Sequence, residues 1–235
     1  AYRAHIQKIY AGARYLSHID ATMTQEQKTP GLDRKVVTGK LAGFVIRGHD
    51  KDKKERAFIV TAAHIIPKEI DTDRPYDCVV SVEYDFGKEK AAAEIYAYDK
   101  NYDVALLVFK DPKYVYKGNY AKFGKPDNSV PGDEVIALGS PTGDPYCVSA
   151  GLLSRKDVDF PAPRDLIIHT AGMTFGNSGG PLLNSDGEVI GMNIQVKVVP
   201  LDKFGLRIMS TPFGIALSAK SILFIMPELE RGNKI

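Results

Sequence analysis

Short apolar runs separated by turn residues recur about every ten residues from Lys35 onward, and this spacing constrains the fold more than any other feature. Runs of this kind, rich in β-branched and aromatic residues and bounded by Gly, Pro, Asn and Asp, are typical of strands in sandwiches and barrels. We expect strands over residues 36–46, 57–62, 78–84, 90–98, 104–109, 134–138, 147–156, 166–170, 181–183, 188–196 and 207–217. The sequence therefore predicts an all-β protein made of two packed six-stranded antiparallel β-barrels.

Two helices are expected, one at each end of the chain. Within residues 1 to about 27, apolar side chains recur at spacings of three and four, which predicts an N-terminal helix (Ile6, Ile9, Ala13, Leu16 and Ile19). In one interpretation this helix packs against its own barrel, and in the other it forms a contact between copies or a tether to an upstream segment. A short C-terminal helix is capped by Ser218 and ends at Pro227.

The same pattern divides the chain into three parts. Residues 1–30 form the N-terminal helical segment, residues 31–115 the first barrel, and residues 116–235 the second barrel with the C-terminal helix. Pro and Gly residues concentrated between 110 and 131 mark the connector. A chain of 235 residues is long enough to give both barrels a hydrophobic core.

Composition and charge exclude several classes of protein. Hydrophobic residues make up 44% of the chain and charged residues 26%, as in globular proteins and unlike disordered ones. The 31 basic and 29 acidic residues nearly balance, so there is no electrostatic reason to expect a nucleic-acid partner. We expect no membrane span in this chain, because no apolar run reaches the roughly 18 to 20 residues that cross a bilayer.

The cysteines and histidines predict neither a disulfide framework nor a metal site. Cys78 and Cys147 are the only cysteines, and we expect them in different halves of the protein without a disulfide between them. The histidines other than His64 do not stand at ligand spacings with Cys, Asp or Glu, so no metal and no cofactor is expected.

A serine between glycines is the strongest indication of chemistry. Ser178 lies in the run Thr-Phe-Gly-Asn-Ser-Gly-Gly-Pro at 174–181 and is the candidate nucleophile. A serine hydroxyl is a weak nucleophile that needs a neighbouring base and preformed donors for the oxyanion it creates. We place this oxyanion hole in the turn Gly176, Asn177, Ser178, with the N–H groups of Gly176 and Ser178 as donors, because glycine permits the required backbone.

Two further residues supply the partners that such a serine needs. His64 follows the apolar run 57–60, where a strand is expected to end, and Asp103 directly precedes the expected strand 104–109. Either residue alone is an ordinary surface or core group. Together they fit the template in which a serine gives its proton to an imidazole that a carboxylate holds in the correct tautomer.

These motifs resemble those of trypsin-like serine proteases, and more specifically the protease domain of HtrA-type enzymes. The matching segments are Thr-Ala-Ala-His at 61–64, Asp-Val-Ala-Leu-Leu at 103–107, Gly-Asn-Ser-Gly-Gly-Pro at 176–181, and the flanking strands at 137–143 and 187–193. The resemblance covers about residues 38 to 226. The order His, Asp, Ser also differs from the orders in subtilisins and α/β-hydrolases.

The resemblance implies a chymotrypsin-like fold and a serine endopeptidase that cleaves proteins or peptides through an acyl-enzyme. It also implies a pocket for the residue before the scissile bond, walled by Met173, Val196 and Phe213, with Gly172 where trypsin places its charge-selecting aspartate. No wall carries a charge, so small or medium aliphatic residues are expected there. Asn177 replaces the aspartate of activatable proteases, which disfavours activation by N-terminal cleavage.

The resemblance has further implications, and other functions stay open. It implies a homo-oligomer, a trimer, as one role of the N-terminal segment, and it favours an extracytoplasmic location, periplasmic or secreted. Only about ten residues follow the final helix, so we expect no PDZ module in this chain. The alternative is a catalytically latent or chaperone-like peptide-binding module on the same fold. An esterase is weaker, because its usual nucleophile elbow is missing.

Overall fold

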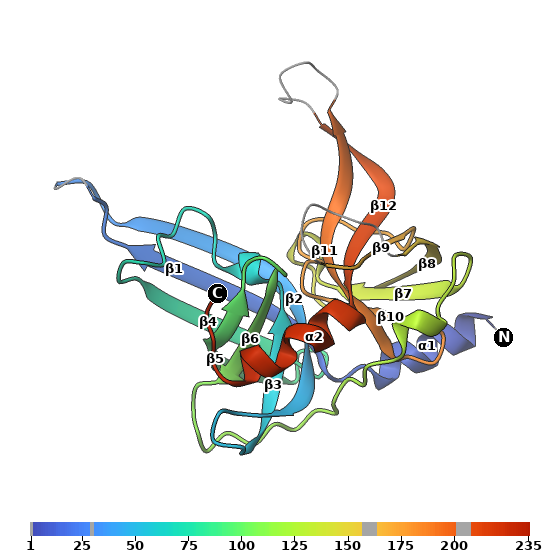
Figure 1. The fold of residues 1–235 in the computed structure, drawn as a ribbon, viewed down its shortest axis with the longest axis horizontal. Helices are drawn as coiled ribbons and strands as arrows, with labels where there is room; N and C mark the ends of the chain where they lie inside the picture. Colours follow the sequence, from blue (N-terminus) through green and yellow to red (C-terminus); the bar gives the residue numbers. More distant parts are fainter. Residues whose placement is uncertain (1, 29–30, 157–163, 201–207) are drawn as a thin grey trace.

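The computed structural model describes residues 2–28, 31–156, 164–200 and 208–235, and it shows two β-barrels side by side (Figure 1). The strands of the first barrel are β1 (Leu16–Gln25), β2 (Lys35–His49), β3 (Glu55–Thr61), β4 (Asp77–Tyr84), β5 (Glu89–Asp99) and β6 (Val104–Phe109). Those of the second are β7 (Glu134–Gly139), β8 (Cys147–Arg155), β9 (Leu166–His169), β10 (Pro181–Leu183), β11 (Val189–Pro200) and β12 (Ile208–Ser218). Two helices, α1 (Tyr2–Gly12) and α2 (Ala219–Glu230), flank them. The predicted fold class is confirmed.

Each barrel is a closed antiparallel sheet. The strand order is β1-β2-β3-β6-β5-β4 in the first, where β4 pairs back to β1, and β10-β11-β12-β9-β8-β7 in the second, where β7 pairs back to β10. Closure leaves no unpaired strand edge in either barrel. Both barrels can therefore hold functional loops at fixed positions.

Alternating apolar side chains fill the two barrels. Phe44, Ile59 and Leu107 are fully buried in the first, and Leu182 and Ile190 are fully buried in the second. Successive residues of a strand face opposite sides, so each strand sends every second side chain into the core. Each buried side chain of this size contributes about 1.5–3 kcal/mol of transfer free energy.

The N-terminal segment differs from its prediction. The helix expected over residues 1 to about 27 ends at Gly12, and β1 begins four residues later. This strand completes the first barrel, for which the sequence pattern had located only five of the six strands. Ile19, Ala21 and Met23 are buried and alternate with more exposed polar residues, so the strand period prevails over the spacing of three and four in this stretch. Residues 29–30, which end the predicted segment, and residue 207, which begins the last predicted strand, lie outside the described residues.

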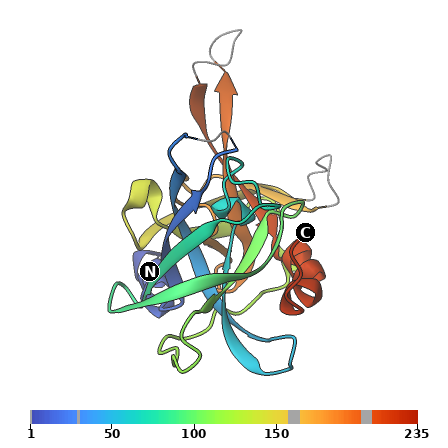
Figure 2. The ribbon, with the colours of Figure 1, turned by 90° about the vertical axis from the view of Figure 1, so that its left-hand side faces the viewer.

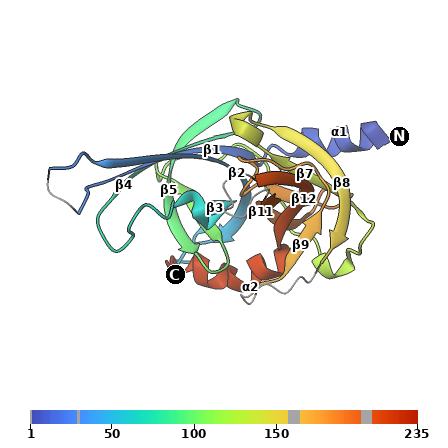
Figure 3. The same cartoon turned by 90° about the horizontal axis from the view of Figure 1, so that it is seen from above.

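Helix α1 packs on its own chain. Its Tyr10 ring meets Phe86 edge-on at 5.1 Å, and its hydroxyl donates to the carbonyl of Tyr146 in the second barrel. Just after the helix, Arg14 binds the Asp85 carboxylate through two hydrogen bonds of 2.8 and 2.9 Å and holds the pKa of Asp85 below its usual range. Figure 3 shows α1 and α2 on opposite sides of the molecule.

Helix α2 is longer than predicted. Ser218 caps it as expected, because its side chain accepts from the N–H of Lys220, but Pro227 lies inside the helix and does not end it. The last turn is held by tertiary contacts: Leu229 is fully buried, and Glu230 binds Tyr96 through its carbonyl at 2.8 Å. These contacts outweigh the hydrogen bond that proline removes. Neither described helix has both the length and the apolar character to cross a membrane.

Two groups of strands extend outward from the barrels. Figure 1 shows β1, β2 and β4 continuing away from the second barrel, and Figure 2 shows β11 and β12 rising above both barrels. The β1–β2 pairing is continuous from Leu16 with Phe44 to Gln25 with Lys35, and β4 pairs with β1 from Ser17 with Tyr84 to Thr24 with Asp77. The outer parts of these three strands therefore form one antiparallel sheet.

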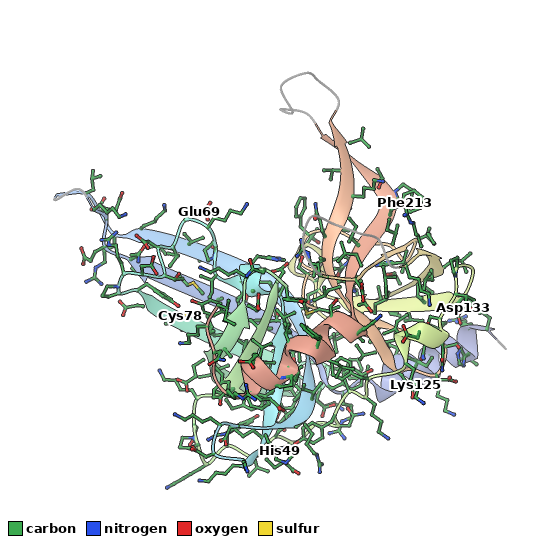
Figure 4. The ribbon with its side chains drawn as sticks, viewed as in Figure 1. His49, Glu69, Cys78, Lys125, Asp133 and Phe213 are labelled. Carbon is green, nitrogen blue, oxygen red and sulfur yellow. The ribbon has the colours of Figure 1, made fainter. Side chains whose placement is uncertain are left out.

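The two cysteines lie in different barrels, as predicted. Cys78 is on β4 (Figure 4) and Cys147 is on β8, and both are free thiols. Burial raises the pKa of the Cys78 thiol.

A fully buried histidine lies inside the second barrel. His169, at the end of β9, has its Nε2 atom 3.1 Å from the Asn193 side-chain oxygen, and Asn193 in turn donates to the carbonyl of Pro181 at 3.4 Å. Burial disfavours the charged ring and lowers the pKa of His169 to about 4.

This shift predicts a loss of stability in acid. Between pH 6.5 and pH 4 the unfolded chain binds a proton at His169 and the folded protein does not, so stability is present above pH 6.5 and is lost as the pH falls toward 4. The His169 contribution should lower the free energy of unfolding by about 3 kcal/mol over this range. Urea unfolding of the wild type and His169→Gln at pH 7.5 and pH 4 measures it.

The matched control is His49→Gln, because His49 is exposed. We expect the control to keep the pH dependence of the wild type and His169→Gln to lose this part of it. Equal pH dependence in all three proteins would show that His169 titrates as an ordinary histidine.

Candidate functional site

His64 lies on the short 3₁₀ turn η1 (Ala63–Ile65), directly after β3. The end of β3 is anchored because the Thr61 hydroxyl donates to the carbonyl of Ala42 on β2 at 2.8 Å. The imidazole of His64 is about half exposed. The ring therefore lies at the surface of the first barrel, on a turn whose position is set by the anchored end of β3.

Asp103 directly precedes β6 and faces His64. Its Oδ1 atom accepts the backbone N–H of His64 at 2.9 Å, and its Oδ2 atom lies 2.9 Å from Nδ1 of the ring. A carboxylate only accepts hydrogen bonds, so Nδ1 carries the proton and Nε2 keeps its lone pair. Asp103 has a left-handed backbone, with φ of 59°, which directs its side chain back toward η1. The pair is therefore set up for Nε2 to act as a base.

Ser178 lies in the loop between β9 and β10, and two positions of this loop require glycine. Gly176 and Gly179 have φ of 98° and 86°, in the region that favours glycine. A Cβ atom on Gly176 would lie 2.2 Å from the carbonyl oxygen of Ser140, and one on Gly179 would lie 2.2 Å from that of Ala42. Any side chain at these positions would push the loop away from its neighbours.

The loop is tied to both barrels by backbone hydrogen bonds. Ala42 on β2 donates to the carbonyl of Ser178 at 2.9 Å, and Gly179 donates to the carbonyl of Asn193 on β11 at 2.7 Å. Asn193 donates in return to the carbonyl of Gly180 at 2.8 Å. Ser178 is thus held between a strand of the first barrel and a strand of the second.

Two N–H groups of the loop are left without acceptors. In the tight turn 174–177, Asn177 donates to the carbonyl of Thr174 at 3.3 Å, and Gly176 has the positive φ that a type II turn requires at this position. The Phe175 carbonyl accepts from Thr142 at 2.6 Å, so the opposite edge of this peptide, the Gly176 N–H, points away from Thr142. Within the described residues, neither the Gly176 N–H nor the Ser178 N–H has an acceptor.

Asn177 differs from Gly176 and Ser178 because its backbone N–H already has an acceptor. Its N–H is used in the turn, and its side chain is buried against β7, where a Cβ atom on Gly139 would lie 2.4 Å from the Asn177 amide oxygen. The sequence prediction grouped Asn177 with Gly176 and Ser178. In the structure it orders the turn and presents no free backbone donor.

The Ser178 hydroxyl donates to the carbonyl of Ile194 at 3.2 Å. No hydrogen bond joins it to His64 in the described part of the chain. Rotation about one side-chain bond moves a serine hydroxyl between acceptors, and such bonds are often long or misaligned without substrate. His64, Gly176 and Ser178 nevertheless line one pocket of about 290 Å³, so these three residues border the same space.

The predicted pocket residues lie on or beside strands of the second barrel, and none of them lines the pocket of His64 and Ser178. Val196 pairs with Gly214, and Gly214 pairs with His169, so these positions are level across β11, β12 and β9. A Cβ atom on Gly214 would lie 2.6 Å from the Met173 side chain, which places Met173 beside this row. Gly172 is exposed, and a Cβ atom there would meet only Ser149 at 3.8 Å.

Phe213 lies on β12 (Figure 4), directly before Gly214, in the irregular stretch between the pairs Val196 with Gly214 and Val198 with Ser210. Its side chain is half-buried. Its role as a wall of the specificity pocket stays a prediction.

Two residues near the site were missed from the sequence. Thr142, on the 3₁₀ turn η3 (Pro141–Gly143), orients the Phe175–Gly176 peptide through its N–H, and a backbone contact leaves no trace in residue type. His169 lies beneath Gly214, where a Cβ atom would lie 2.5 Å from its ring. Its place in the apolar run Leu-Ile-Ile-His at 166–169 was the available signal for burial.

Several known proteins are similar to this chain. A DegP-like probable periplasmic serine endoprotease of Brucella suis biovar 1 is 35% identical over 169 residues, which cover 71% of this chain and 29% of that protein. A protein of the same description from Pseudomonas fulva is 30% identical over 193 residues, which cover 81% of this chain and 36% of that protein. The chain therefore spans about a third of the length of these relatives.

Solved structures give the same fold. The HtrA-type protease AlgW with a decapeptide superimposes with a TM-score of 0.71 at 20% sequence identity, covering 99% of this chain and 69% of that one. A model of the trypsin-like peptidase domain matches residues 42–192, more than half of the chain, including His64, Asp103 and Ser178. The chain belongs to the trypsin-like peptidase domain family.

Proposed function

We propose that this chain is a serine endopeptidase that hydrolyses peptide bonds of proteins through an acyl-enzyme. One observation carries the proposal: His64, whose imidazole is bound to Asp103, lines one pocket together with Ser178 and with Gly176, whose N–H has no acceptor among the described residues. These are the base, the nucleophile and the oxyanion donor that acyl transfer needs. The names of the DegP-like relatives support the same reaction.

In the proposed mechanism, Ser178 Oγ leaves the Ile194 carbonyl and attacks the carbonyl carbon of the substrate. His64 Nε2 takes the hydroxyl proton, and Asp103 stabilises the resulting imidazolium through Nδ1. The oxyanion accepts hydrogen bonds from the N–H groups of Gly176 and Ser178. His64 then gives the proton to the leaving amine. In the second half of the reaction, water loses a proton to His64, attacks the acyl-enzyme and releases the acid, while Ser178 Oγ regains a proton from His64.

For specificity, we propose that the residue before the scissile bond packs near Met173, Val196 and Gly172, with Phe213 at the edge. None of these four residues carries a charge, and burial keeps His169, which lies beside Gly214, neutral. A charged side chain without a partner would lose its hydration there, whereas each buried methylene gains about 0.8 kcal/mol. Small and medium aliphatic residues should be preferred.

A latent or chaperone-like peptide-binding module stays the alternative. The observation in its favour is the hydrogen bond of the Ser178 hydroxyl to Ile194 in place of His64. Reaction with a phosphonofluoridate separates the two, since only an activated Ser178 forms the adduct rapidly. Casein digestion by the same preparation distinguishes turnover from labelling alone.

The cellular setting is also a proposal. The relatives named as periplasmic support an extracytoplasmic location. A homotrimer through the N-terminal segment is proposed with it, and the exposed Tyr2 of α1 is available for such a contact.

Ser178→Ala should abolish turnover and leave the fold intact, because the hydroxyl makes one bond at the surface of the loop. Loss of a triad member costs on the order of 10⁴–10⁶ in kcat. Peptide hydrolysis and circular dichroism of the wild type and variant test this. Retention of more than a tenth of the activity would assign the nucleophile to another residue.

Asp103→Asn should lower kcat by about 10⁴, because an amide nitrogen placed against Nδ1 favours the wrong imidazole tautomer. The labelling rate of Ser178 by a phosphonofluoridate should fall with it. Asp77→Asn is the control, since the Asp77 side chain is 80% exposed and lies away from His64. A mild effect of Asp103→Asn would move the orienting role to another carboxylate.

A peptide library should show aliphatic residues before the scissile bond favoured over Arg, Lys, Asp and Glu by at least about tenfold, or 1.4 kcal/mol. Gly172→Asp should shift the preference toward Lys and Arg, because the open space at Gly172 accepts a carboxylate. Gly172→Asn is the uncharged control and should leave the aliphatic preference in place. If Asp and Asn act alike, Gly172 does not face the substrate.

A further inference from the structure

We propose that a cavity between helix α2 and the connector binds an extended peptide segment, which adds as a short strand to the edge of β2. The cavity measures about 790 Å³, within the range of ligand-binding cavities. Its walls come from residues 46–47 of β2, residues 118–123 of the connector and one face of α2. None of these residues lines the pocket of His64 and Ser178, so the proposal goes beyond the proposed peptidase activity.

The edge of β2 has a gap in its backbone hydrogen bonding at this cavity. The Val45 carbonyl accepts the N–H of Ala121 in the connector at 2.8 Å. Four residues later, the His49 N–H donates to the Glu230 carboxylate of α2 at 3.0 Å. Alternate residues of a strand direct their N–H and C=O groups to the same side. Those of Arg47 therefore point between these two anchors.

Arg47 has no backbone partner on this side within the described residues. It lies opposite Ala57 of β3, and by the same alternation its N–H and C=O groups point away from β3. No backbone hydrogen bond outside the β2–β3 pairing involves Arg47, and the residue is exposed. A free N–H and C=O pair at an accessible strand edge is the feature to which an added strand hydrogen-bonds.

The length of the gap fits a short peptide. Residues 45 and 49 lie roughly 13 Å apart along a strand that rises about 3.3 Å per residue, so about three residues fit between the anchors. In an antiparallel arrangement the central residue exchanges both hydrogen bonds with Arg47. The residues before and after it then place their side chains on the same face as Ile46.

The part of the cavity beside Ile46 is apolar. Ile46 and Met226 are buried, whereas Leu223 is 45% exposed although it lines the cavity. Leu223 and Met226 are three residues apart on α2 and therefore share one face of the helix. Helix α2 crosses from one barrel to the other (Figure 1), so this face is held by contacts at both of its ends. Two aliphatic side chains of an added strand would cover Leu223.

The charges at the rim favour an acidic central residue. The Arg47 guanidinium lies 4.7 Å from the centroid of the Tyr120 ring and 3.5 Å from the exposed Glu55 carboxylate. Lys122 is exposed and has no ion pair within the described part of the chain. The carboxylate of Glu230 is already used by the strand edge. Opposite charges on directly opposite strand residues attract, so the occupant is a segment such as Leu-Glu-Leu.

Adjacent residues of α2 provide a matched pair of variants. Leu223 lines the cavity, whereas Phe224 is 74% exposed and does not line it. Successive helix residues point about 100° apart. Leu223→Glu therefore places a carboxylate in the cavity, and Phe224→Glu adds the same charge on another face of the helix.

Fluorescence anisotropy with the labelled peptide Gly-Leu-Glu-Leu-amide measures binding, in the Ser178→Ala background so that the peptide is not cleaved. It should bind at least about tenfold more tightly than the Gly-Ser-Glu-Ser and Gly-Leu-Lys-Leu amides. Leu223→Glu should weaken binding by about tenfold, and Phe224→Glu should leave it unchanged. Equal effects of the two variants would overturn the proposal.

N-methylation of the peptide tests the strand pairing itself. A methyl group on the central glutamate nitrogen removes the donor to the Arg47 carbonyl and should weaken binding by about tenfold. A methyl group on the nitrogen of the preceding leucine is the control and should have little effect, because that N–H points away from β2. Equal binding of the two methylated peptides would overturn the strand addition. Laurate that competes with a peptide insensitive to methylation would assign the cavity to an anionic amphiphile instead.

Photocross-linking locates the peptide. With benzoylphenylalanine in place of the first leucine, adducts should form within residues 118–123 or 223–230. Adducts confined to residues 37–41 or to Phe175 would place the peptide in the pocket of His64 and Ser178 and overturn the proposal. None of these measurements depends on hydrolysis, so their failure leaves the proposed peptidase function unaffected.

Discussion

The hydrogen bond from the Ala42 N–H to the Ser178 carbonyl joins the two barrels at the point on which the site depends. It forms because Gly179 has no side chain: a Cβ atom there would lie 2.2 Å from the Ala42 carbonyl oxygen and 2.3 Å from Thr61 Oγ1. Thr61 ends β3, and His64 follows three residues later. The contact that seats the serine loop on the first barrel therefore also sets where the imidazole stands relative to the hydroxyl. Loss of this contact would separate the proposed nucleophile from its base while leaving both barrels folded.

The proposed oxyanion donors depend on a second, weaker arrangement. The Gly176 N–H points away from Thr142, because the carbonyl at the other edge of the same peptide accepts the Thr142 N–H at 2.6 Å and the Thr174 hydroxyl at 3.1 Å. Thr142 itself has a left-handed backbone, with φ of 52° and ψ of 18°, which costs a non-glycine residue on the order of 1 kcal/mol. The orientation of this peptide therefore depends on a strained turn and on a side chain of the loop itself, and not on strand pairing. The proposed triad and the proposed oxyanion donors are thus positioned by different contacts. An ordered His64–Asp103 pair does not by itself produce a working oxyanion hole.

Local sequence patterns predicted most of the fold, and they failed where tertiary contacts decide. The runs 57–60 and 104–109 are apolar throughout because both faces of β6 and of the second half of β3 are buried. The ends of these strands, and with them the positions of His64 and Asp103, could therefore be predicted from the sequence. The stretch 16–25 carries Leu16 and Ile19 three residues apart, which imitates a helix, although Ile19, Ala21 and Met23 follow the strand period. Pro227 stays inside α2 because Leu229 and Glu230 are held by the first barrel. The Thr142 contact joins Thr142 to Phe175, which lie in different loops, and the pocket of His64 and Ser178 brings together segments more than a hundred residues apart. No local pattern records such proximity.

Both barrels contribute to the surroundings of Ser178. Met173, Val196 and Gly172 lie on or beside strands of the second barrel, whereas most residues that line the pocket with His64 and Ser178 belong to β1, β2 and the segment after η1. Phe175 and Gly176 of the serine loop also line that pocket, and the loop is hydrogen-bonded to β2 through Ser178 and to β11 through Gly179. The serine loop therefore links the surfaces that the two barrels present, and the placement of Ser178 depends on contacts with both.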